Sequence, residues 1–398
     1  MGPGSVSRAL LDAAAAVWPG ADRLSVVRSP WSAEGTRDYL VLPHVVSPRW
    51  LLPADAPHTA AALADQGSGP LRRLAARGLA LAHRSGVVRR LPVRRLRVRD
   101  GNDDSLVALL REGFGENVEV GVRLAAWDQA RGLVVRVFDP EGTTLAFGRM
   151  GVDDHGRAAV QAERHGLSRA SELGLRTVVP PALIGVPQWR GDDVLLLAPL
   201  TPVGTQAPDS HVPVEAMMEL AHAGASRAAN LASSGWWSSV TYRLALVEDD
   251  ALRAELDVAR HALAASGTTV LQLGAWHGDW TPWNMAYDGR RVLLWDWEHF
   301  AEDVPVGFDM LHYLAQHTRV SRGTNSTAEQ AWRAQGAKLV GGAAGLAATE
   351  SDLVVLAYLL EVNLRFVLDR QGTPAATAAR QGWGLDLLQR ESQRLTGG

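Results

Sequence analysis

Two acidic side chains and one amide are the residues of this 398-residue chain whose types and spacing are best suited to chemistry. Asp279 and Asn284 lie in a polar segment between two apolar runs, and Asp296 follows the second run. Magnesium prefers oxygen ligands of this kind, and a carboxylate can also orient a hydroxyl group and accept its proton. The spacing therefore predicts a phosphate and metal site. A β-hairpin with a polar tip is the alternative, but it does not explain why three oxygen donors converge on one loop.

Two apolar runs are expected to form the strands that hold this loop. Residues 268–275 (TTVLQLGA) are rich in β-branched and aliphatic side chains, and residues 291–295 (RVLLW) form a second, shorter run. Short apolar runs of this composition are typical of strands. The polar groups then lie in the loop between them.

The loop resembles the catalytic loop of kinases. His277, Gly278 and Asp279 are followed by Asn284 at the kinase spacing, and Asp296 begins an Asp-Trp-Glu sequence after the second strand. Over residues 276–309 this combination is similar to the aminoglycoside phosphotransferase and choline kinase family of kinase-like enzymes.

The resemblance implies a bilobal, protein-kinase-like α+β fold, with an antiparallel sheet in the small lobe and a mostly helical large lobe. It implies that Asp279 orients and deprotonates the acceptor hydroxyl, that Asn284 and Asp296 bind Mg²⁺, and that ATP or GTP donates the phosphate. Asp309 resembles the family's structural acid beyond Asp-Trp-Glu.

The patterns along the chain predict three regions, which are an N-terminal α/β cap (1–112), the small lobe (113–200) and the helical large lobe (201–398). A cap before the small lobe is also similar in architecture to bacterial maltokinase-type sugar kinases. The expected strands of the first two regions span 39–42, 50–52, 117–124, 132–139, 143–150 and 194–200. The expected helices span 5–18, a segment from Pro70, 157–173, 213–233, 249–265 and 351–370.

The nucleotide site is expected to depart from the family pattern at Arg149. A kinase-like small lobe carries a lysine on its third strand, paired with a glutamate on the next helix. Arg149 takes the lysine position, Glu163 is the candidate partner, and Lys338 is the only lysine in the chain. A guanidinium does not replace an ammonium group without a change of geometry. A degenerate, pseudokinase-like binding protein is therefore an alternative, and a surface salt bridge is the alternative for Glu163.

Backbone groups are expected to complete the nucleotide site. Residues 194–200 lead into the predicted hinge, where backbone groups of Ala198 and Leu200 are expected to contact adenine; Pro199 lacks an N–H group. Phosphate coverage is assigned to the turn over 127–132, because the small lobe has no G-x-G-x-x-G sequence.

The acceptor is expected to be a small molecule, because no protein-kinase activation segment fits between Asp296 and Asp309. A sugar or sugar-containing metabolite is favoured, with an indole of the loop against its C–H face. The candidate acceptor-binding residues are Trp280, Glu298, Glu361 and Asn363. For the tryptophans the alternative is core packing, and for Glu361 and Asn363 it is intramolecular pairing.

A cationic aminoglycoside is the alternative acceptor. It would be bound by acidic side chains, of which Glu298, Glu302, Asp303 and Glu361 are the candidates. The same charges could instead solvate a loop.

Composition excludes several other classes. The chain is 46% hydrophobic and 21% charged, has a net charge of −3, and contains no cysteine and no apolar run of eighteen residues. We therefore expect a cytoplasmic globular protein that binds neither membrane nor nucleic acid. Residues 70–99 contain ten arginines and no acid, which is typical either of a phosphate-binding or nucleic-acid-binding patch or of the solvated faces of the cap. The oligomeric state is left open.

Overall fold

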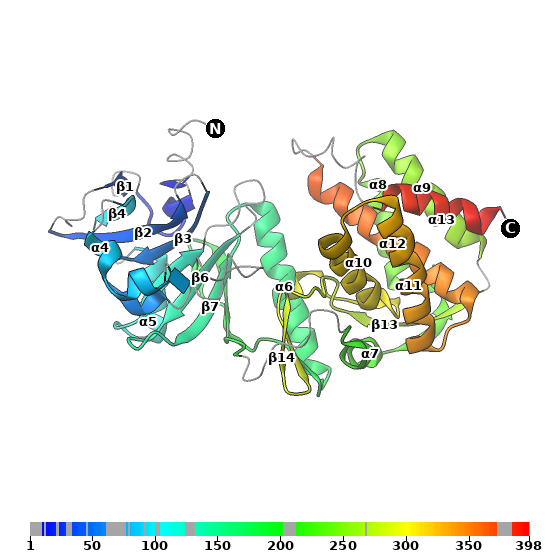
Figure 1. The fold of residues 1–398 in the computed structure, drawn as a ribbon, viewed down its shortest axis with the longest axis horizontal. Coiled ribbons are helices and arrows are strands. Elements are labelled where there is room, and N and C mark those ends of the chain that lie inside the picture. The colour runs from blue at the N-terminus through cyan, green and yellow to red at the C-terminus, as the bar shows by residue number, and fades with distance from the viewer. Residues whose placement is uncertain are drawn as a thin grey trace. The chain divides into compact units, whose positions relative to one another are not determined.

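The computed structural model describes most of the chain, and Figure 1 shows its ribbon. The described residues are 10–11, 13–20, 24–28, 34–44, 47–60, 77–78, 80–90, 93–99, 104–123, 132–201, 212–266, 269–371 and 384–397. The first part of the expected helix from Pro70 and most of the expected turn over 127–132 lie outside these residues, as does the first part of the expected helix over 5–18. Residues 77–78 and 80–84 are helical, as the pattern from Pro70 predicted.

The chain folds into two compact units. Unit 1 comprises Met1–Arg164 and Ala182–Pro199, and unit 2 comprises His165–Pro181 and Leu200–Gly398. Unit 1 is built on an antiparallel sheet and unit 2 is mostly helical. The predicted α+β class with these two kinds of lobe is confirmed.

One ten-stranded antiparallel sheet forms the framework of unit 1, in the order β1-β4-β2-β3-β5-β6-β7-β11-β10, with β9 paired to β11. Its strands are β1 (Leu24–Val27), β2 (Thr36–His44), β3 (Ser47–Pro53), β4 (Arg95–Arg99), β5 (Glu119–Arg123), β6 (Leu133–Phe138), β7 (Thr144–Met150), β9 (Leu183–Gly185), β10 (Gln188–Trp189) and β11 (Asp192–Leu197). Its helices are η2 (Pro57–Ala60), α4 (Val87–Arg90), α5 (Leu106–Phe114) and the first part of α6 (Asp154–Glu172).

The expected cap and small lobe share this sheet. Strand β3 pairs with β5, with Trp50 opposite Arg123 and Leu51 opposite Val122, so the expected boundary at residue 112 falls inside one sheet. Successive residues of a strand point to opposite faces. Accordingly Leu51 packs in one hydrophobic core and its neighbour Trp50 in another. Both faces of the sheet are therefore covered.

Unit 2 contains two three-stranded sheets among its helices. The strands are β8 (Val178–Val179), β12 (Arg227–Asn230), β13 (Val270–Trp276), β14 (Met285–Asp288), β15 (Arg291–Leu294) and β16 (Ala301–Pro305). The helices are α7 (Val214–His222), η3 (Leu231–Ser233), α8 (Gly235–Ala245), α9 (Asp250–Ala265), η4 (Trp297–His299), α10 (Phe308–Arg322), α11 (Ser326–Ala344), α12 (Ala348–Arg370) and α13 (Leu385–Thr396).

The expected helix over 213–233 is wrong in its second half. Helix α7 ends at His222, and Gly224 takes a left-handed conformation with φ of 69°. Residues of β12 then pair with β13 instead of continuing the helix. The alanine-rich sequence favours a helix, but glycine in this conformation ends one and the free edge of β13 provides the alternative hydrogen bonds.

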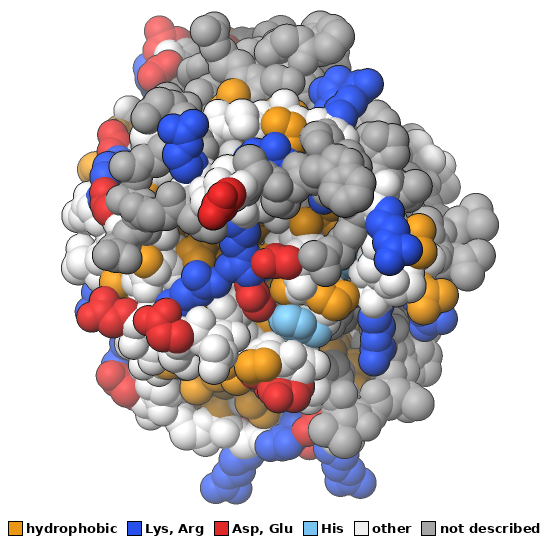
Figure 2. All heavy atoms as spheres, turned by 90° about the vertical axis from the view of Figure 1, so that its left-hand side faces the viewer, with side chains coloured by type: hydrophobic (Ala, Val, Ile, Leu, Met, Phe, Trp, Pro, Cys, Tyr) orange, Lys and Arg blue, Asp and Glu red, His pale blue; other side chains and the backbone are white. Residues whose placement is uncertain are grey.

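The arginine-rich stretch of the cap is partly neutralised. Arg97 forms a two-point ion pair with Asp38, at 2.7 and 2.9 Å, and the buried Arg95 lies 4.0 Å from the same carboxylate. Figure 2 shows acidic and basic side chains interspersed on the face that lies to the left in Figure 1. Pairing within unit 1 therefore accounts for these two arginines without a phosphate-binding patch. Among the described residues, no helix has the length and apolar character needed to span a membrane.

Gly274 provides the first test of the packing in unit 2. A Cβ atom there would lie 1.8 Å from the carbonyl oxygen of Ala221, because α7 packs directly on β13. We expect Gly274→Ala to lower the free energy of unfolding by at least about 1–3 kcal/mol, measured by urea denaturation. Gly342→Ala is the control, since a Cβ atom on this exposed helical glycine meets nothing within 4 Å. A wild-type midpoint for Gly274→Ala would contradict the packing.

Candidate functional site

A buried carboxylate fixes the backbone of the loop between β13 and β14. The Oδ2 atom of Asp309 accepts the His277 N–H at 2.8 Å, and its Oδ1 atom accepts the Gly278 N–H at 3.1 Å. Burial raises the pKa of Asp309 to about 7, although these two hydrogen bonds act in the opposite direction. Asp309 therefore has the structural role that the resemblance implied.

Gly278 is required by the shape of the same loop. Its φ is 86°, and a Cβ atom would lie 2.3 Å from the carbonyl oxygen of His299. The Nη1 atom of Arg365, on α12, donates to the Gly278 carbonyl at 2.8 Å. The loop is thus bound to η4 by close packing and to α10 and α12 by hydrogen bonds.

Asp279 follows this fixed backbone, and both of its carboxylate oxygens have partners. Oδ2 accepts from Asn284 Nδ2 at 2.7 Å, and Oδ1 lies 3.0 Å from His312 Nε2. Burial alone would raise the pKa of Asp279, but the hydrogen bond from His312 and the charge of Arg365 lower it to about 2. The side chain retains 28% of its exposure, so an ionised, oriented carboxylate faces the surface of unit 2.

The residues predicted to hold a metal ion are adjacent at the end of a hairpin. Met285 of β14 pairs with Leu294 of β15, and next to this pair the Trp295 N–H donates to the Asn284 carbonyl at 3.1 Å. Asn284 and Trp295 therefore lie opposite each other, and Asp296 is the residue that follows Trp295. Asp296 has a φ of 75°, which is rare for a residue with a side chain and is typical of functional sites.

The donor set at this position fits Mg²⁺. Asn284 Nδ2 donates to Asp279, which leaves the Asn284 Oδ1 atom as the oxygen available to a cation. Among the described residues, no cluster of three or more His, Cys, Asp or Glu side chains forms a closed metal cage. Magnesium in phosphotransfer sites is normally held by one or two carboxylates, with phosphates and water completing its shell.

Unit 1 contains the expected arginine and glutamate pair. Arg149 Nη1 lies 2.6 Å from Glu163 Oε2, and the glutamate side chain is only 1% exposed. The pair is therefore buried on the glutamate side and not a surface salt bridge. The backbone N–H of Ala198 donates to the Ala182 carbonyl at 2.8 Å, so this donor is already used within unit 1.

Trp280 was predicted to contact the acceptor, and the structure corrects this prediction. Its side chain is completely buried, and its indole Nε1 donates to Met285 Sδ at 3.3 Å. Trp280 is therefore core, which the sequence analysis treated as the alternative. Trp283 is instead 51% exposed and directly precedes Asn284.

Two further acceptor candidates are also occupied within unit 2. Glu361 is buried and forms a two-point ion pair with Arg243, and it accepts the Trp236 Nε1–H at 2.9 Å. Asn363 is buried and donates to the Leu359 carbonyl at 2.8 Å. Both predictions are corrected to intramolecular pairing. Glu298 is partly exposed and lies 3.6 Å from His299 Nε2.

Three residues of the site were not found from the sequence, namely His312, Tyr358 and Arg365. His312 lies three positions after Asp309, so the two share one face of α10, and this spacing could have identified it. Tyr358 and Arg365 lie on α12, where polar groups interrupt an apolar helix. Their partners are distant in sequence, and no local pattern names them.

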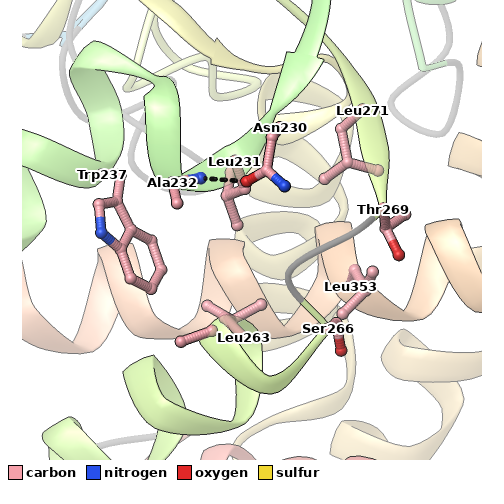
Figure 3. A pocket seen from close by; sticks show the side chains of 10 residues that line it. Asn230, Leu231, Ala232, Trp237, Leu263, Ser266, Thr269, Leu271 and Leu353 are labelled. Carbon is pink, nitrogen blue, oxygen red and sulfur yellow. Dashed lines mark hydrogen bonds between the residues drawn. The ribbon is translucent and has the colours of Figure 1, made fainter.

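A small, mostly apolar hollow lies elsewhere in unit 2 (Figure 3). Its lining residues are Asn230, Leu231, Ala232, Trp237, Leu263, Ala264, Ser266, Thr269, Leu271 and Leu353. In Figure 3 the side chain of Asn230 is turned to the backbone N–H of Ala232, to which it is bonded at 2.9 Å. The hollow includes none of the predicted site residues, so it is not part of the candidate site.

No protein-family profile and no curated protein sequence matches the chain. Solved structures with a similar arrangement of elements include a choline/ethanolamine kinase family protein from Mesorhizobium loti, at 17% identity and a TM-score of 0.42, covering 67% of this chain and 86% of that chain. A macrolide 2'-phosphotransferase from Brachybacterium faecium is 16% identical, with a TM-score of 0.40 and coverages of 70% and 96%. An amicoumacin kinase solved with AMP-PNP and Ca²⁺ is 10% identical, with a TM-score of 0.44 and coverages of 73% and 93%.

The raised pKa of Asp309 predicts a pH-dependent stability. Between the ordinary value of 3.8 and about 7, the folded chain keeps a proton that the unfolded chain releases, so this group stabilises the fold less as the pH rises. We expect the difference in unfolding free energy between wild type and Asp309→Asn to shrink by about 1–3 kcal/mol from pH 5 to pH 8. Urea denaturation at both pH values measures it. A difference that does not change with pH would contradict the assignment.

Proposed function

We propose that this chain is a magnesium- and nucleotide-dependent phosphotransferase that acts on the hydroxyl group of a small molecule. The observation that carries the proposal is the geometry of Asp279, an ionised carboxylate with both oxygens held at 2.7 and 3.0 Å, beside an asparagine whose amide oxygen remains available. Phosphoryl transfer needs an oriented carboxylate beside an oxygen ligand for the metal ion, and this arrangement supplies both.

Asp279 is the proposed base. The acceptor hydroxyl would donate a hydrogen bond to its carboxylate, and as the acceptor oxygen bonds to the γ-phosphorus, the bond to the leaving nucleoside diphosphate breaks and the hydroxyl proton passes to Asp279. A pKa of about 2 makes this carboxylate a weak base. A weak base suits a loose transition state, in which the proton leaves late and orientation matters more than early deprotonation.

The remaining predicted residues are proposed to bind the donor nucleotide. Asn284 Oδ1 and Asp296 would hold Mg²⁺, which offsets the negative charge of the β- and γ-phosphates. Arg149, fixed by Glu163, would contact the α- and β-phosphates. Because the Ala198 N–H is already bonded, adenine recognition by backbone donors would fall to Leu200.

A neutral hydroxyl compound, such as a sugar, is the proposed acceptor. Three of the four acids that would attract a cationic aminoglycoside already have arginine partners in unit 2. These pairs are Glu302 with Arg169, Asp303 with Arg227, and Glu361 with Arg243. The exposed indole of Trp283 offers a face on which a sugar ring can pack.

A binding protein that keeps the fold without phosphoryl transfer is the second candidate, since Arg149 replaces the usual lysine. The test measures ADP or GDP release across a panel of neutral sugars, aminoglycosides and amino alcohols, with Mg²⁺ and either nucleotide. Acceptor-dependent release supports the phosphotransferase. Tight binding of a non-hydrolysable nucleotide without any turnover would support the binding protein.

Asp279→Asn is expected to lower turnover by roughly two to four orders of magnitude, because the acceptor hydroxyl loses its proton acceptor. Calorimetry with AMP-PNP and Mg²⁺ should show unchanged nucleotide affinity in this variant. Arg149→Ala should show the reverse, with weakened nucleotide binding. Arg164→Ala is the matched control, because this exposed arginine of α6 pairs with Asp193. Full turnover by Asp279→Asn would remove Asp279 from the proposed role.

Trp283 separates the two kinds of acceptor. For a neutral sugar, Trp283→Ala should weaken acceptor binding by about 10-fold or more, and added salt should have little effect. For a cationic aminoglycoside, affinity should fall steeply with salt because screening weakens its attraction to the acids. Acceptor affinity is measured at low and high salt for wild type and Trp283→Ala, which gives both the effect of the substitution and the salt dependence. A steep salt dependence with no effect of the substitution would contradict the neutral acceptor.

A further inference from the structure

We propose that His312, held in a single tautomer by Tyr358, positions the Asp279 carboxylate for phosphoryl transfer. The inference rests on the proposed role of Asp279 as the group that meets the acceptor hydroxyl. His312 lies on α10 and Tyr358 on α12, so two helices distant in sequence support one side chain of the loop.

The three side chains form a continuous line from the core of unit 2 to its surface. Tyr358 Oη lies 3.1 Å from His312 Nδ1, and His312 Nε2 lies 3.0 Å from Asp279 Oδ1. Tyr358 and His312 are 1% and 2% exposed, whereas the Asp279 side chain is 28% exposed. Only the last member of the line can touch an acceptor, so His312 is a positioning residue and not a catalytic one.

The chemistry of the partners fixes each proton in this line. Burial lowers the pKa of His312, and the positive charges of Arg365 and Arg319 lower it further. Asp279 acts in the opposite direction but does not outweigh them, so the imidazole is neutral. An aspartate carboxylate is ionised at neutral pH and can only accept, so the single imidazole proton must lie on Nε2, which is 3.0 Å from Asp279 Oδ1. Nδ1 is then an acceptor.

Tyr358 is the donor that this tautomer requires. Burial raises the pKa of Tyr358, which keeps its hydroxyl protonated, and the hydroxyl donates to His312 Nδ1. The opposite tautomer would place an unprotonated Nε2 against the Asp279 carboxylate. The amide nitrogen of Gln316 lies 3.4 Å from Nε2, and a 180° turn of this amide presents its oxygen to the same N–H as a second acceptor.

The consequence is a carboxylate that cannot rotate. Asn284 holds Oδ2 and His312 holds Oδ1, so the lone pairs that remain on Asp279 point in directions set by the fold. Pre-organisation of this kind matters most for a weak base, because its contribution to the rate comes from geometry. His312 also shares α10 with Asp309, so the same helix sets both the loop backbone and the carboxylate.

Nuclear magnetic resonance of the full chain, labelled with ¹⁵N in its 12 histidines, tests the proton assignment directly. His312→Gln identifies the His312 signals by their loss. At neutral pH we expect a neutral imidazole with its proton on Nε2, and Tyr358→Phe should shift this population toward the other tautomer. Tyr242→Phe, at an exposed tyrosine, is the control. An imidazolium, an Nδ1–H tautomer in the wild type, or no response to Tyr358→Phe would overturn the proposal.

Steady-state kinetics tests the positioning role of His312. The assay uses the best acceptor from the panel, or magnesium-dependent ATP hydrolysis, in which water is the acceptor. His312→Ala should lower kcat by roughly 10- to 100-fold with an unchanged KM for ATP, and His312→Gln should recover part of the loss because its amide N–H can reach Asp279. In an Asp279→Asn background, His312→Ala should cost nothing further. Additive losses would overturn the role. Absence of wild-type turnover would refute the proposed function, while the spectra would still decide the tautomer.

Discussion

The candidate site depends on the contact between the Asp309 carboxylate and two consecutive backbone N–H groups. His277 and Gly278 have their N–H groups buried in the loop, where an unpaired donor would cost about 1–3 kcal/mol. No strand or helix ladder can supply the acceptors, because Gly278 has a left-handed φ of 86° that takes it out of any regular element. Asp309 supplies both acceptors from the first turn of α10. The direction in which Asp279 leaves the backbone is therefore set by a helix that comes thirty residues later in the chain.

Arginine performs most of the charge compensation in unit 2. A buried carboxylate needs partners that satisfy its lone pairs, and the planar guanidinium can offer two N–H groups at once. Arg243, Arg169 and Arg227 each do so, for Glu361, Glu302 and Asp303 respectively. The two carboxylates of the site differ, because Asp309 is paired with neutral backbone donors and Asp279 with an amide and an imidazole. Both carboxylates of the site are thus held by groups other than an arginine side chain.

Local sequence patterns predicted the parts of the structure that are themselves local. Strands β13 and β15 and helices α6, α9 and α12 were placed within a few residues, because alternation and helical periodicity act over one element. Strand β14, which directly follows the loop, was not predicted. The loop residues were found because their spacing is fixed by one hairpin. The continuous sheet of unit 1 was missed, since the pairing of β3 with β5 joins residues about seventy apart. The ion pair between Arg243 and Glu361 was likewise not predicted, because the two residues are far apart in the sequence and no local pattern indicates their contact.

Exposure was the property that sequence patterns predicted least well in the loop. Trp280 and Trp283 have the same side chain in neighbouring positions, yet one is fully buried and the other is 51% exposed. The difference follows from the turn between them, in which the Asn284 N–H donates back to Thr281 and reverses the chain. Trp280 then faces Met285 while Trp283 faces outward. A turn of this tightness is set by tertiary contacts, so composition alone could not separate the two.

The pair in unit 1 and the loop in unit 2 differ in what they reveal about function. Glu163 is buried, and a buried glutamate without a cation would destabilise the fold, so Arg149 has a structural reason to be there whether or not a nucleotide binds. Asp279 differs in its exposure. Its side chain is partly exposed, whereas the histidine and tyrosine behind it are buried, and their line of hydrogen bonds ends at its carboxylate. The loop, more than the arginine that replaces a lysine, is therefore the feature that favours a phosphotransferase over a protein that only binds.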